Sequence, residues 1–148
     1  MKIFLAGGDR TQFVLAMQAV GYPYRLCSYF YLKDEWKTRD LLFAAIADAP
    51  QIDWIMDSGL FSFMFGSEQG TLNGFADYHA YATKYLADVK QWGWRHAIVE
   101  CDAQRVLGVP ETHRLRQELF EPSGLEVIYV WHIPEGEAGL ELMACKYE

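Results

Sequence analysis

The stretch DWIMDSGLFSFMFG, residues 53–66, decides how this sequence folds. It begins as an apolar run, typical of a buried strand, and that run ends at a carboxylate, Asp57. Ser58 and Gly59 follow directly, and three phenylalanines come after them. In parallel α/β folds the functional groups collect where the carboxyl ends of the strands meet. The stretch therefore predicts that Asp57 lies at a functional edge of a parallel sheet.

Apolar strand-like runs alternate with helical patterns along the whole chain. The expected strands cover 2–7, 24–32, 52–59, 96–102 and 126–134, and the expected helices cover 11–21, 37–49, 74–92, 110–121 and 136–147. This alternation predicts parallel strands joined by right-handed crossovers. We expect a single α/β domain over residues 1–148. It is either a partial (β/α)8 barrel of about five units, which we prefer, or an open parallel sheet, because a complete barrel needs about 250 residues.

Composition excludes several classes of protein. The net charge of −7 argues against a protein that neutralises nucleic-acid phosphates over its whole surface, although a local basic groove remains compatible. No apolar run reaches the length of a membrane span, so we expect no membrane association. Cys27, Cys101 and Cys145 are far apart and form no CxxC pair, which favours a reducing cytoplasm and no structural zinc. Gly7 and Gly8 do not begin a GxGxxG motif, so we expect no dinucleotide and no other cofactor.

Ionisable residues end four of the five expected strands. They are Asp9, Asp57, the pair Glu100 and Asp102, and His132. Each has a structural interpretation: the aspartates can cap turns, Glu100 can be buried and paired, and His132 can be a hydrogen-bonded histidine at the edge. Together they also suggest a metal-dependent enzyme, in which Asp57, Glu100, Asp102 and His132 converge on Mg²⁺ or Mn²⁺.

The motif DSGLFS at 57–62 resembles a known family. It is similar to the DSGGFQ motif of the tRNA-guanine transglycosylases, and to the DSGAFS version in phage-encoded relatives linked to 7-deazaguanine insertion into nucleic acids. The segments SYFYLK at 28–33, IVECDAQ at 98–104 and GLEVIYVWHIPEG at 124–136 follow the same order as in those relatives. The resemblance implies a cytoplasmic, phage-derived protein, acting in the host cell, that binds a purine-like base or nucleic acid.

The resemblance also implies roles for individual residues. The motif aspartate faces the base pocket in the family, and this role passes to Asp57. The aspartate after the fourth strand reads the amino edge of the base, and this role passes to Asp102. A carboxylate suits both roles because a guanine-like edge presents N–H donors. Asp57 and Asp102 are thus the expected catalytic residues, and Ser58, Gly59, Phe61 and His132 are expected to complete the substrate-binding site.

Two departures from the family keep other functions open. Leu60 and Ser62 replace the second glycine and the glutamine of the motif. The aspartate nucleophile and the zinc ligands of the family would follow residue 148. Any base exchange at a glycosidic bond would then need the rest of the barrel from more chain or from a partner. The alternative is a non-catalytic scaffold derived from the family, which would cover an incomplete barrel by self-association.

Overall fold

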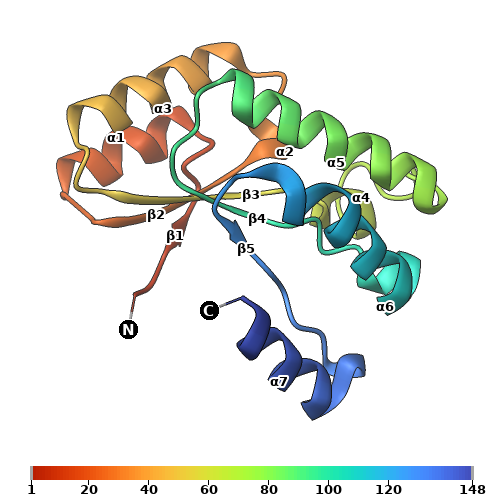
Figure 1. Cartoon of the computed structure of the whole chain (residues 1–148). Coiled ribbons are helices and arrows are strands. Elements are labelled where there is room, and N and C mark those ends of the chain that lie inside the picture. The colour runs from red at the N-terminus through yellow and green to blue at the C-terminus, as the bar shows by residue number, and fades with distance from the viewer. Residues whose placement is uncertain (1, 148) are drawn as a thin grey trace.

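The structure is a computed structural model that describes residues 2–147, and its centre is a parallel sheet of five strands (Figure 1). The strands are β1 (Leu5–Ala6), β2 (Tyr24–Ser28), β3 (Asp53–Asp57), β4 (Ala97–Val99) and β5 (Val127–Ile128). They lie side by side in chain order, and every neighbouring pair is parallel. The sheet is open, with β1 and β5 at its edges, and does not close into a barrel. The expected α/β fold is confirmed in its open-sheet form.

Helices alternate with the strands, as the sequence predicts. They are α1 (Thr11–Ala19), α2 (Tyr29–Leu32), α3 (Trp36–Asp48), α4 (Phe61–Met64), α5 (Gly74–Gln91), α6 (Gln104–Leu115) and α7 (Gly136–Lys146), with the short turns η1 (Arg116–Phe120), η2 (Glu121–Ser123) and η3 (Ile133–Glu135). None of the helices formed by residues 2–147 is long and apolar enough to cross a membrane.

Several elements differ from their expected bounds. The strands expected over 2–7, 96–102 and 126–134 are shorter, as β1, β4 and β5. The strand expected over 24–32 ends at Ser28, and its last residues form α2. Tyr29 and Leu32 are both fully buried, and their spacing of three places them on the same face of a helix. The helix expected over 110–121 begins earlier, at Gln104, and bends where Gly108 adopts a positive φ of 79°.

The helices α1, α3, α5 and α6 lie on one face of the sheet (Figure 1). Strand residues that point to this face are buried, such as Cys27, Met56 and Ile98. The alternate residues point to the opposite face and stay accessible, and Ile128 is 38% exposed there. One side of the sheet is thus a core and the other is uncovered.

Helix α5 attaches the core to the carboxyl ends of the strands. Tyr78, Ala82, Tyr85 and Val89 form its buried stripe. The Tyr85 hydroxyl donates hydrogen bonds to the backbone oxygens of Met56 (2.8 Å) and Val99 (3.3 Å). A buried hydroxyl needs such partners, and these two bonds fix the ends of β3 and β4 relative to each other.

Candidate functional site

Asp57 ends β3 at the carboxyl edge of the sheet. Its Oδ2 accepts a hydrogen bond from the backbone N–H of Gly59 at 2.8 Å, which closes a tight turn. Gly59 has a φ of 75°, and a Cβ at this position would lie 2.3 Å from Cβ of Phe30. Only glycine fits there, so the turn that aims Asp57 depends on this residue.

Asp102 follows β4 and lies close enough to Asp57 to influence it. Burial raises the pKa of Asp57, the Gly59 hydrogen bond opposes this effect, and the negative charge of Asp102 raises the pKa further. Asp9, after β1, also has a raised pKa because it is partly buried. The carboxyl edge therefore carries aspartates after three strands, and Asp57 and Asp102 are close enough for one charge to affect the other.

His132 connects Asp102 to a second carboxylate. Its Nε2 lies 2.6 Å from Oδ1 of Asp102, and its Nδ1 lies 2.7 Å from Oε1 of Glu135. The ring is 8% exposed, whereas the Asp102 side chain is 48% exposed. A neutral imidazole carries one N–H, yet both of its nitrogens here face carboxylate oxygens. Asp102 and Glu135 thus hold the ring from both sides.

Glu135 continues this chain of hydrogen bonds to His113. Its Oε1 also accepts the backbone N–H of His132 at 2.8 Å, and its Oε2 lies 2.8 Å from Nε2 of His113. Burial raises the pKa of Glu135, but the bonds from His132 and His113 outweigh burial and hold its pKa below the usual value. Sequence reasoning missed Glu135, although its position three residues after His132 is the spacing of a capping box.

Glu100 lies on the other face of the sheet from Asp57. It is 1% exposed and receives a bidentate pair of hydrogen bonds from Arg116 in η1, at 2.6 and 2.9 Å. The backbone N–H of Val130 donates a third bond at 2.7 Å. Glu100 is therefore a buried, paired residue, which was its structural interpretation.

The alternative of a metal site at Asp57, Glu100, Asp102 and His132 finds no support among residues 2–147. Glu100 is occupied by Arg116 on the helix-covered face, so the four side chains do not converge. Residues 2–147 contain no group of three or more His, Cys, Asp or Glu side chains that could hold a metal ion.

No known relative identifies this chain. No family model, no curated protein and no solved structure matches it. The similarity of DSGLFS to the transglycosylase motif therefore stays a prediction, and the chemistry of the site has to be argued from its own geometry.

The remaining predicted residues fall into two groups. Ser58 is buried, and its backbone oxygen accepts a hydrogen bond from the Tyr81 hydroxyl at 2.6 Å, so it supports the turn from below the surface. Phe61 is 68% exposed, and its ring lies 5.1 Å from that of Phe65. The guanidinium of Arg105 stacks over Phe65 at 4.9 Å. An exposed aromatic pair with one cation therefore lies directly after the Asp57 turn.

The arrangement can offer both acceptors and donors to a ligand. Asp102 presents a carboxylate that is half exposed and held in place by His132. Asp57 has a raised pKa, so it takes up a proton more readily than an ordinary aspartate. Two such groups on neighbouring strands can meet the N–H donors of a polar, planar ligand edge.

Proposed function

We propose that this chain binds a guanine-like or 7-deazaguanine base at the carboxyl edge of the sheet, in the manner of the transglycosylase-like proteins that its motif resembles. The observation that carries the proposal is the pairing of Asp57 and Asp102 on neighbouring strands, close enough for the charge of one to raise the pKa of the other.

The proposed recognition follows from the hydrogen-bonding groups of the two acids. The N–H groups on the amino edge of a guanine-like base donate to Asp102, which His132 holds in a fixed orientation. The second polar contact with the base comes from Asp57, at the end of the neighbouring strand. The exposed ring of Phe61 stacks on the base from outside the turn. Base exchange at a glycosidic bond would add a nucleophile from outside residues 2–147 to this binding site.

Thermal unfolding tests the proposal. We expect guanine or 7-deazaguanine at about 100 times its dissociation constant to add roughly 2.7 kcal/mol to the free energy of unfolding. For a chain of this size that is a rise of several degrees in Tm. The variant Asp102→Asn should lose most of the shift, because an amide in place of the carboxylate presents one acceptor instead of two.

The matched control is Asp48→Asn, which removes the same charge from an exposed position at the end of α3. It should respond to the base like the wild-type protein. An unchanged Tm for wild-type protein with every base tested, at concentrations up to their solubility, would rule out the proposed site.

A second candidate function is a self-associating scaffold. The observation that favours it is the accessible apolar face of the sheet, which carries Leu26, Ile55 and Ile128 opposite the helices. A second copy of the chain is the occupant we propose for this face. The two functions are compatible, since the carboxyl edge and the open face are different surfaces.

A further inference from the structure

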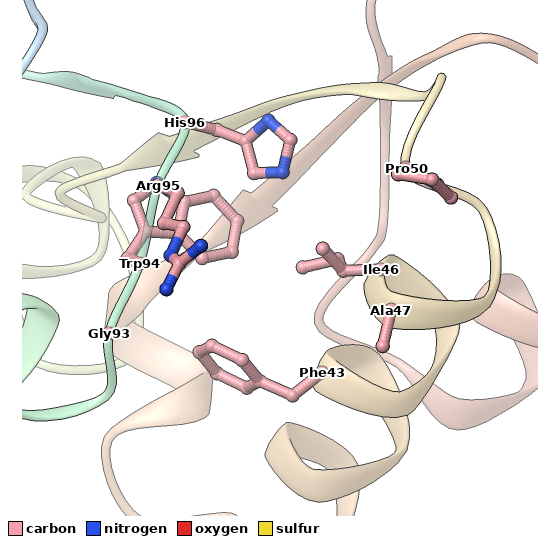
Figure 2. A pocket seen from close by; sticks show the side chains of 8 residues that line it. All are labelled: Phe43, Ile46, Ala47, Pro50, Gly93, Trp94, Arg95 and His96. Carbon is pink, nitrogen blue, oxygen red and sulfur yellow. The ribbon is translucent and has the colours of Figure 1, made fainter.

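A pocket of about 420 Å³ lies at the opposite end of the sheet from Asp57 and Asp102 (Figure 2). One wall is the face of α3 that carries Phe43, Ile46 and Ala47. The other wall is the segment 93–96, which leads into the first residue of β4. Because parallel strands share one direction, the beginning of β4 marks the amino edge of the sheet. The pocket is thus separate from the proposed base site.

The apolar part of the pocket is preformed. Trp94 is buried, and its ring meets that of Phe43 edge to face, with centroids 6.0 Å apart and an angle of 80°. The indole N–H donates to the backbone oxygen of Ala97 at 3.3 Å, which fixes the ring. Figure 2 shows Ile46 on α3 facing this wall across the cavity. A flat or branched apolar group can therefore enter without rearranging the core.

The polar part of the pocket is cationic. Arg95 lines it, is exposed, and forms no salt bridge with any of residues 2–147. No carboxylate lines the pocket. His96 stands beside Arg95, and its burial lowers its pKa despite the opposing charges of Asp53 and Glu126. The ring is therefore neutral at pH 7, and Arg95 supplies the charge.

We propose that this pocket binds a small amphipathic carboxylate, with an aromatic or branched apolar body. The carboxylate pairs with the guanidinium of Arg95, whose fork of N–H donors matches two carboxylate oxygens. The apolar body lies between Ile46 on one wall and Trp94 on the other. A pocket of this volume is in the lower part of the range for small-molecule sites, which suits a ligand of this size. In a chain of net charge −7, a lone arginine beside an apolar pocket selects for such an anion.

Calorimetric titration with phenylacetate, 4-phenylbutyrate and octanoate tests the proposal, each compared with its neutral amide. We expect at least one carboxylate to bind with a dissociation constant of about 0.1–1 mM, as is usual for ligands this small. The matching amide should bind about tenfold more weakly, since it lacks the charge-assisted bond.

Two variants locate the binding. Arg95→Gln should weaken carboxylate binding about tenfold and leave amide binding unchanged. Ala47→Phe, at an exposed position in the wall, should fill the pocket and remove binding of both. Arg10→Gln is the matched control, because it removes the same charge from an exposed position after β1, at the other end of the sheet. No binding of any of these probes at about 10 mM, or binding that Arg95→Gln leaves unchanged, would overturn the proposal.

Discussion

Arg116 is the residue on which the ionised state of Glu100 depends. The two side chains are 4% and 1% exposed, and the Arg116 guanidinium also donates to the backbone oxygen of Val130 at 3.0 Å. Burial raises the pKa of Glu100, and the hydrogen bonds and charge of Arg116 oppose that rise. A buried carboxylate without its partner is far more costly than the pair.

We expect Arg116→Met to lower the free energy of unfolding by about 3–5 kcal/mol, because it leaves Glu100 buried and uncompensated. The double variant Glu100→Met, Arg116→Met should recover a large part of this loss. Urea unfolding measures both. Arg114→Met serves as the control, since it breaks only the exposed contacts of Arg114 with Glu111 and Glu118 and should have a much smaller effect.

The pH dependence of Arg116→Met provides an independent check. Without the guanidinium the folded-state pKa of Glu100 rises above its already raised value, while the unfolded value stays ordinary. A group whose pKa is raised on folding stabilises the folded state fully below its unfolded-state pKa. That stabilisation is lost as the pH rises through its folded-state pKa. The deficit of the variant relative to wild type should therefore shrink in acid. An equal deficit at pH 4 and pH 7 would contradict this account.

At the scale of elements, the turn from β3 into α4 depends on one backbone conformation. Gly59 combines a φ of 75° with a space in which a Cβ would also lie 2.6 Å from Oγ of Ser28. We expect Gly59→Ala to lower the free energy of unfolding by more than about 2 kcal/mol, the sum of the conformational strain and the clash.

Gly93→Ala separates the two effects. Gly93 also has a positive φ, of 68°, but nothing lies within 4 Å of an added Cβ. It should cost only about 1 kcal/mol, which is the conformational part alone. Denaturant unfolding of the two variants gives the comparison. Equal losses would mean that the turn relaxes away from Phe30 and that Asp57 is not held as the structure indicates.

The elements themselves could be predicted from the sequence, but several contacts between them could not. Strands and helices can be located because the spacing of their apolar residues is visible within a short stretch of sequence. The acids at strand ends locate the carboxyl edge of the sheet because parallel strands share a direction. Side chains that are brought into contact by irregular turns leave no repeating pattern in the sequence. Glu100 meets Arg116 across 16 residues through the π-helical turn η1, and His113 meets Glu135 across 22. The sequence left the alternative of a metal site at Glu100 open for this reason, since it does not reveal that Arg116 pairs with this carboxylate.

At the scale of the whole molecule, α1, α3, α5 and α6 cover one face of the sheet and leave most of the other open, with α7 near its β5 edge (Figure 1). A hollow of about 280 Å³ on this face is lined by Ile55, Ala97 and Ile128, from three of the strands, and by Phe4, which precedes β1. Its polar border carries both signs of charge, since Lys2 pairs with Asp53 at 2.7 Å. Mixed charges around an apolar centre are self-complementary, which supports a second copy as the occupant despite the net charge of −7.

We expect the chain to form a dimer at concentrations of tens of micromolar, measured by sedimentation equilibrium. Ile128→Lys places a charge in the apolar centre from the 38% exposed edge position and should shift the protein toward monomer. Val20→Lys makes the same chemical change at a 75% exposed position after α1, on the helix-covered side, and should leave the dimer intact. High salt should weaken the dimer only modestly, because apolar burial rather than the charged border supplies most of the free energy of association. A wild-type monomer at these concentrations would remove the scaffold function from consideration, while base binding at the carboxyl edge would be unaffected because Asp57 and Asp102 take no part in the proposed contact.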